Sequence, residues 1–159
     1  MIWIYSLIIT AMVITLALID LRTMQLPNYL TLPLMILGLL VSSFTNFGFC
    51  QAHESIIGLI LGYSLIWGVN FFYFLVTKKH GIGMGDAKLL SAFGSILGYF
   101  YILPILFIAS VLGLLGGIIW LKLNKLSHQH AFPFGPYLCI SGLIAIFDIV
   151  SNTFFIRNF

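Results

Sequence analysis

The chain has 159 residues, of which 61% are apolar and only 7% charged, and its formal net charge is +3. A soluble domain carries roughly 25% charged residues, so this composition excludes a water-soluble globular protein and predicts an integral membrane protein. The length suits a single domain, residues 1–159, with room for about six crossings of roughly 20 residues each. The basic residues flank apolar segments, which indicates membrane orientation and no nucleic-acid partner.

The first apolar segment, residues 2–19, predicts a retained transmembrane helix. No positively charged region precedes it and no small-residue cleavage site follows it, so it does not fit a secretory signal peptide. Further segments of single-helix length follow at 29–46, 55–77 and 133–154.

The remaining apolar segment, residues 88–121, is too long for one crossing. As a single helix it would measure roughly 50 Å, against a hydrocarbon core of about 30 Å. Gly98 and Pro104 can break a helix in its middle. We therefore expect two helices, at 87–98 and 102–121, of which the first is short.

The distribution of basic residues favours this division. With six helices, almost all of them fall on one side of the membrane, which the positive-inside rule makes the cytoplasmic side. The predicted fold class is therefore all-α and polytopic, with about six transmembrane helices and both termini outside. Arg157 lies on the outer side, and the cytoplasmic set is Arg22, Lys78, Lys79, Lys88, Lys122 and Lys125.

Pairs of glycines four residues apart predict close helix packing, because small residues let helix backbones approach in lipid. The pairs are Gly58 with Gly62, Gly94 with Gly98, and Gly113 with Gly117.

Two of the four acidic residues are predicted to share one membrane face and one depth. Asp20 ends the first helix and Asp86 begins the fourth, both on the cytoplasmic side. Glu54 is expected in the second, outer loop, and Asp148 nearer the outer face. An Asp at a helix centre costs about 3 kcal/mol on insertion scales, and less toward the ends, so the two cytoplasmic carboxylates need an explanation.

One explanation is chemical. Two Asp side chains a few ångström apart share a proton, since both cannot easily ionise. The ionised carboxylate can take a proton from water while the protonated one polarises a carbonyl, which hydrolyses an amide without a metal. The alternative is that Asp20 and Asp86 cap their helices or lie in the hydrated interface.

A glycine-rich stretch, GIGMG at residues 81–85, comes directly before Asp86. Backbone with so little side-chain cover can adopt positive φ angles and admit another backbone. The stretch lacks the GK[ST] ending of a phosphate loop. Gly83 and Gly85 are therefore expected to shape a peptide site. Lys88 either sets the charge of the pair, meets a substrate carboxylate, or reaches the interface as a surface lysine does.

Three patches resemble the type IV prepilin peptidases, which are membrane aspartic peptidases of the GxGD type. The first patch is IDLRTMQLPNYLTLPL, with Asp20. The second is GMGDAKLLSAFGSILG, with Gly83, Gly85 and Asp86, and the third is FPFGPYLCISG at residues 132–142. They follow the family's order over almost the whole chain.

The resemblance implies that Asp20 and Asp86 are the catalytic pair. It implies a prepilin or type II secretion pseudopilin substrate, cut after a glycine at the cytoplasmic face of the bacterial inner membrane, and hence a role in pilus biogenesis or type II secretion. In the third patch, Pro133, Gly135 and Pro136 are expected to shape the rim of the site.

No cofactor or metal is expected. Cys50 and Cys139 lie far apart and form no zinc-ligand spacing, and surface positions are expected for His80, His128 and His130. Many family members carry an extra N-terminal domain with paired cysteines that is linked to methylation. This sequence resembles the peptidase core alone, so we expect peptidase activity without methyl transfer.

Two rival interpretations belong to other classes of protein. A small transporter or channel subunit would use Asp20 and Asp86 as ion ligands, although the two halves show no evident internal repeat. A structural subunit would keep both acids in the interface. Cleavage of a peptide by the purified protein separates the first interpretation from both.

Overall fold

The computed structural model describes residues 2–44, 48–78, 83–123 and 133–158, and its described elements are all helical. Six α-helices follow one another along the chain, with one 3₁₀ turn, η1 (Tyr99–Tyr101), between the fourth and fifth. The α-helices are α1 (Ile2–Thr23), α2 (Asn28–Phe44), α3 (Ala52–Thr77), α4 (Met84–Leu97), α5 (Ile102–Leu123) and α6 (Gly135–Asn158).

The break predicted near Gly98 is confirmed. Gly98 has a φ of 85°, a left-handed conformation that favours glycine, and ends α4. After η1 the chain continues as α5, where Pro104 lies in the first turn and costs no hydrogen bond.

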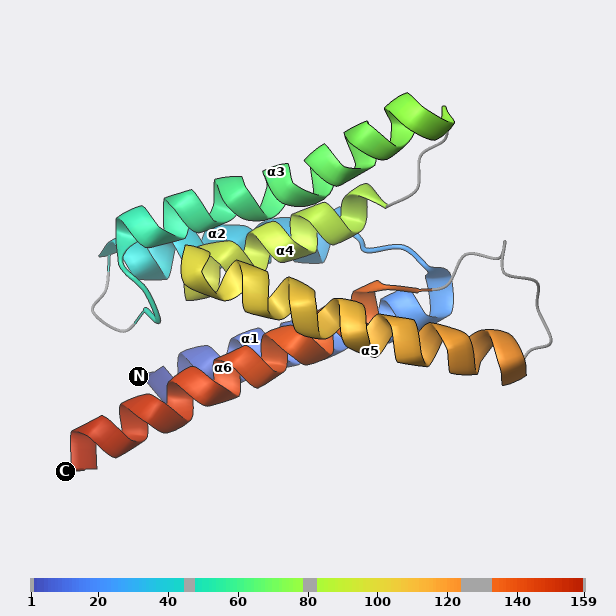
Figure 1. Cartoon of the computed structure of the whole chain (residues 1–159). Coiled ribbons are helices and arrows are strands. Elements are labelled where there is room, and N and C mark those ends of the chain that lie inside the picture. The colour runs from blue at the N-terminus through green and yellow to red at the C-terminus, as the bar shows by residue number, and fades with distance from the viewer. Residues whose placement is uncertain (1, 45–47, 79–82, 124–132, 159) are drawn as a thin grey trace.

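Consecutive helices run in opposite directions, so all their ends fall at two ends of the bundle (Figure 1). One end, called here the carboxylate end, holds the last turn of α1 with Asp20 and the first turn of α4 with Asp86. Both chain termini lie at the other end, called the far end (Figure 1). The prediction that the end of the first helix and the start of the fourth lie on the same side is therefore confirmed.

The short helix α4 is the centre of the bundle. It contacts α2, α3, α5 and α6, and its residues from Leu89 to Leu97 are buried. On one side the ring of Phe93 packs directly on the backbone of Gly142 in α6. The helices form two groups, α2–α3–α4 and α1–α5–α6, that meet along this contact.

Glycines bring α3 and α4 together at backbone distance. A Cβ on Gly58 would collide with the carbonyl of Gly94, and one on Gly62 would lie 2.7 Å from the Leu90 carbonyl oxygen. The Ser55 and Ser91 hydroxyls donate across the same contact, to the carbonyls of Ser95 and Leu59. The predicted packing role is confirmed for Gly58, Gly62 and Gly94.

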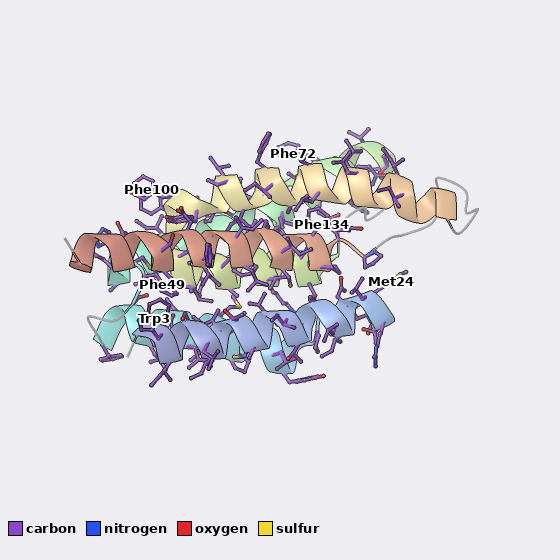
Figure 2. All side chains as sticks on the ribbon, turned by 90° about the horizontal axis from the view of Figure 1, so that it is seen from below. Trp3, Met24, Phe49, Phe72, Phe100 and Phe134 are labelled. Carbon is purple, nitrogen blue, oxygen red and sulfur yellow. The ribbon has the colours of Figure 1, made fainter. Side chains whose placement is uncertain are left out.

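The outer surface of the bundle is apolar. Trp3, Phe72 and Phe100 point away from the helices (Figure 2) and are each more than half exposed. Three segments of the described chain are long and apolar enough to cross a membrane: Trp3–Thr23, Ala52–Thr77 and Tyr99–Ile119. Helices α2 and α6 contribute shorter apolar stretches. Side chains of this kind on the outside of a bundle match a lipid surrounding.

The expectation that Glu54 lies in a loop is wrong. Helix α3 begins at Ala52, and Glu54 lies in its first turn, where its Oε2 accepts a hydrogen bond of 2.9 Å from the backbone N–H of Gln51. An acidic side chain in a first turn satisfies a free N–H and favours the helix dipole, which extends α3 beyond the apolar segment.

The backbone contact between α3 and α4 predicts an unequal response to the same substitution at two glycines. Gly58→Ala should lower the unfolding free energy by about 1–3 kcal/mol, because its methyl group meets rigid backbone. Gly68→Ala, on the same helix, has no atom within 4 Å of the added Cβ and should not destabilise. Thermal unfolding in detergent measures both, and equal midpoints for the two variants would contradict this packing.

Candidate active site

Asp20 lies in the last turn of α1, and its side chain is buried, with 4% of its surface exposed. Its carboxylate faces the first residue of α6. The Gly135 backbone donates a hydrogen bond to it. The N-terminus of a helix offers free N–H groups and a positive dipole end, which bind an anion well. The fold therefore gives the buried Asp20 carboxylate a partner that the sequence distance of more than 100 residues conceals.

Gly135 is a glycine for a steric reason. A Cβ at this position would lie 2.5 Å from Asp20 Oδ2 and 2.9 Å from its Cγ. The prolines on either side, Pro133 and Pro136, are buried, and Pro136 lies at the second position of α6. Proline in a first turn needs no N–H partner. The structure thus places Gly135 of the predicted rim directly beside Asp20, with the buried Pro133 and Pro136 close to it in the chain.

Asp86 lies in the first turn of α4, outside the three candidate spans, and is partly exposed. Burial raises its pKa to about 7, and the negative charge of Asp20 adds to the shift. The Asp20 charge reaches Asp86 across the junction of the two helix groups. The structure places the two carboxylates that the sequence singled out at one end of the bundle, within electrostatic range of each other.

The glycines before Asp86 differ from the predicted loop. Gly83 caps α4 with an ordinary φ of −67°, and Gly85 is already helical. Neither adopts a positive φ angle. Gly85 instead permits a close approach, since a Cβ on it would lie 3.0 Å from the Leu26 Cβ. Gly83 is exposed, while Gly81 lies outside the described residues.

Lys88 does not face the carboxylates. Its Nζ donates a hydrogen bond of 2.7 Å to Asn28 Oδ1 at the start of α2. This bond ties the first turns of α2 and α4 together at the carboxylate end. Among the described residues Lys88 makes no ion pair with Asp20 or Asp86. Its observed role is therefore to hold the start of α4 against the start of α2.

One residue that the sequence interpretation passed over lies beside the pair. Cys139 is fully buried in α6 and is within electrostatic range of both Asp20 and Asp86. It follows Gly135 by four residues, one helical turn deeper on the same face. The four-residue spacing from Gly135 could have indicated that Cys139 faces the same way as Gly135. Its thiol lies on the buried side of the Asp20–Asp86 pair.

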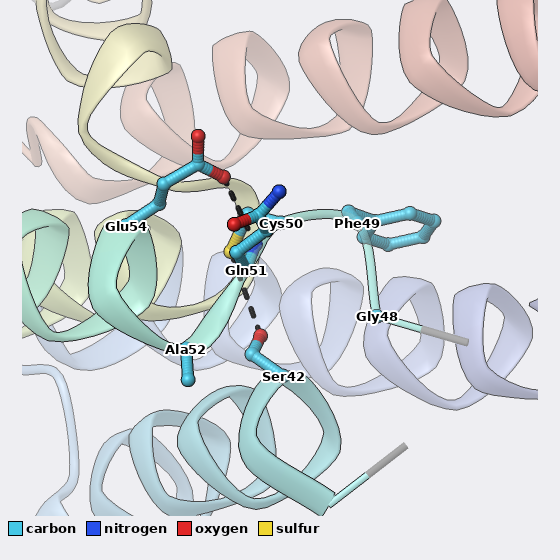
Figure 3. Close-up of a pocket in the computed structure, with 7 residues that line it drawn as sticks. All are labelled: Ser42, Gly48, Phe49, Cys50, Gln51, Ala52 and Glu54. Atoms are coloured by element: carbon cyan, nitrogen blue, oxygen red, sulfur yellow. Dashed lines mark hydrogen bonds between the residues drawn. The ribbon is translucent and has the colours of Figure 1, made fainter. Parts of the chain in front are cut away.

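The other two acids lie at the far end, as expected for both. Glu54 begins α3, and Asp148 is exposed on α6, where it accepts a hydrogen bond of 3.4 Å from the Tyr101 hydroxyl. A cavity of about 480 Å³ opens beside Glu54 and Cys50 (Figure 3), and its lining residues are Ser42, Gly48, Phe49, Cys50, Gln51, Ala52 and Glu54. This cavity does not contain either member of the Asp20–Asp86 pair.

Nothing in the described part of the chain gathers three metal-ligating side chains. Two carboxylates with a thiol on their inner side are instead suited to moving a proton. His80, His128 and His130, for which surface positions were expected, lie outside the described residues.

Comparison with known proteins agrees with these features. Residues 7–118 match the type IV leader peptidase family. A prepilin leader peptidase/N-methyltransferase of Legionella pneumophila is 42% identical over 144 residues, which are 90% of this chain and 49% of that protein. Proteins of the same name from Pseudomonas aeruginosa (36% over 151 residues, 93% and 51%) and Neisseria gonorrhoeae (39% over 139 residues, 87% and 46%) are also similar.

The chain spans about half the length of these curated relatives. No solved structure gives a significant match. The family match covers well over half of the chain. It includes Asp20, Asp86 and the glycines that pack α3 against α4, which are Gly58, Gly62 and Gly94. The chain therefore belongs to the type IV leader peptidase family.

Proposed function

We propose that this protein is a membrane aspartic endopeptidase that removes the leader peptide of type IV prepilins or type II secretion pseudopilins. The observation that supports the proposal is that Asp20 and Asp86 lie at the same end of an apolar bundle, within electrostatic range of each other. The similar proteins are prepilin leader peptidase/N-methyltransferases, and the peptidase half of that name supports the substrate class. No step of the proposal requires a cofactor or a metal.

The two carboxylates differ in surroundings, and the difference assigns their roles. Asp20 accepts a backbone N–H at the start of α6, and in this proposal that charge-assisted hydrogen bond supports giving it the negative charge. Asp86 has a pKa near 7 and carries the shared proton. Asp20 takes a proton from a water molecule as that water attacks the peptide carbonyl carbon, and Asp86 gives its proton to the carbonyl oxygen. Collapse of the tetrahedral intermediate returns a proton to the leaving amine and breaks the C–N bond.

We propose that residues 1–159 form one multi-pass domain of the bacterial inner membrane, with about six crossings and the carboxylate end in the cytoplasm. Two features support this orientation. Arg22, Lys78 and Lys88 lie near the carboxylate end, and both termini lie at the far end (Figure 1). A prepilin whose cut site precedes its apolar helix would then present that site at the depth of Asp20 and Asp86.

Substitution of either carboxylate tests the function. Asp20→Asn and Asp86→Asn should each lower cleavage of a prepilin roughly 100-fold or more, because the proton transfer is lost, while the protein remains in the membrane. Mass spectrometry of the product measures the cut.

Glu54→Gln and Asp148→Asn are the matched controls, since they remove acids at the far end and should retain most activity. Normal cleavage by Asp20→Asn, or ion uptake without cleavage in liposomes of the wild type, would contradict the proposal.

The contact between Asp20 and α6 predicts a strong effect of one methyl group. Gly135→Ala should lower the cleavage rate about tenfold or more, because the added Cβ displaces the Asp20 carboxylate from its position. Ser141→Ala is the control on the same helix, since it removes only a local hydrogen bond to Leu138. A wild-type rate for Gly135→Ala would show that Asp20 does not need this position.

The raised pKa of Asp86 predicts the pH dependence of cleavage. Below about pH 7 the pair holds its proton, and above it the proton is lost. Because the reaction needs the protonated acid, kcat/KM should fall about tenfold per pH unit well above pH 7. A profile measured from pH 5 to 9 tests this, with folding monitored over the same range. A rate that stays flat or rises to pH 9 would exclude Asp86 as the proton donor.

A further inference from the structure

The start of α6 carries two aromatic rings, which belong to Phe134 and Tyr137. Phe134 directly precedes the helix (Figure 2), and its carbonyl accepts the backbone N–H groups of Tyr137 at 3.1 Å and Leu138 at 3.2 Å. Residues three apart lie on the same side of a helical turn, so the two rings form one half-buried aromatic face. Gly135, whose backbone donates to Asp20, lies between them in the chain.

Two glycines of α5 make room for these rings. A Cβ on Gly113 would lie 3.1 Å from Phe134 Cε2 and 3.2 Å from its Cδ2, and a Cβ on Gly116 would collide with the ring and the hydroxyl of Tyr137. Glycine inside a helix costs about 1 kcal/mol relative to alanine, and the groove that Gly113 and Gly116 leave for the rings accounts for that cost. The sequence pattern had paired Gly113 with Gly117, whereas the aromatic contact is made at Gly113 and Gly116.

The first turn of α6 is therefore in contact with two helices at once. Through Phe134 and Tyr137 it packs on α5, and through Gly135 it meets Asp20 of α1. The contact with Asp20 has little slack, since even a methyl group on Gly135 would lie 2.5 Å from Asp20 Oδ2. Residues of one helical turn move together, so a shift of the rings on α5 carries Gly135 with it and changes the position of the Asp20 carboxylate.

We propose that Tyr137 is a positioning residue whose ring, seated on Gly116 of α5, sets the place of the α6 N-terminus beside Asp20. This inference rests on the peptidase function proposed above. Tyr137 acts through Gly135 and takes no part in the proton transfers. A contact that served packing alone would change the stability of the bundle and leave the turnover of the folded protein as it is.

Adding one methyl group beneath the ring tests this role, with purified protein in liposomes and a prepilin peptide as substrate. Gly116→Ala should lower kcat about fivefold or more and change KM less than about twofold, because the displaced turn disturbs the carboxylate and leaves substrate binding intact. Gly68→Ala is the matched control, since its added Cβ has no atom within 4 Å. It should keep the wild-type kcat, and thermal unfolding shows how much of each variant is folded.

Substitutions of the ring itself complete the test. Tyr137→Leu empties the groove and should lower kcat about as much as Gly116→Ala, whereas Tyr137→Phe keeps the ring and should stay within about twofold of the wild type. In the double variant Gly116→Ala with Tyr137→Leu the methyl group no longer meets a ring. Its kcat should therefore match that of Tyr137→Leu within about twofold, whereas independent effects would multiply to about 25-fold or more.

A wild-type kcat in folded Tyr137→Leu, multiplied losses in the double variant, or equal losses in Tyr137→Phe and Tyr137→Leu would each overturn the role of Tyr137. If Gly116→Ala does not fold, the comparison of Tyr137→Leu with Tyr137→Phe decides. Cleavage by the wild type, together with inactive Asp20→Asn and Asp86→Asn, would leave the peptidase function intact in any of these cases. A wild-type protein that does not cleave would overturn both.

Discussion

The burial of the Asp20 carboxylate against the N-terminus of α6 is the contact on which the rest of the site depends. A charged group at this depth is costly in an apolar bundle, and the Gly135 backbone offsets that cost with a hydrogen bond. The contact fixes α1 relative to α6. Asp86 lies at the same end of the bundle, where burial and the charge of Asp20 raise its pKa to about 7.

The bundle holds this pair through contacts made largely by small residues. Gly58 and Gly94 bring α3 and α4 together, and Gly142 receives the ring of Phe93 where α6 crosses α4. Each close contact fixes the position of α4, the short buried helix that carries Asp86. Because Asp20 and Asp86 come from different helix groups, the geometry of the pair depends on how these two groups pack. Packing and chemistry are thus coupled in one small helix.

Much of this arrangement is readable in the sequence. Hydrophobic segments and the Gly98 break predicted the six helices, and the alternation of helix direction predicted that Asp20 and Asp86 share one end. Both depend on local patterns along the chain. The start of α3 was misjudged because Glu54 is polar, although a carboxylate in a first turn stabilises a helix.

The features that were missed arise from contacts between distant segments. The close approach of Gly85 to Leu26 follows from packing between distant segments, which no local pattern reveals. The position of Cys139 beside both carboxylates depends on how α6 faces α1 and α4. In each case a residue type was visible, but its partner lay in another helix.

The central claim is that the side chains at positions 20 and 86 meet at one end of the bundle, and chemical cross-linking tests it most directly. The double variant Asp20→Cys with Asp86→Cys is made in a background of Cys50→Ala and Cys139→Ala and treated in native membranes with a short bifunctional thiol reagent. The account predicts an efficient intramolecular cross-link, and none when Asp20→Cys is combined with Asp148→Cys, which lies at the far end. Failure of the first pair to cross-link, with both thiols reactive toward a monofunctional reagent, would contradict it.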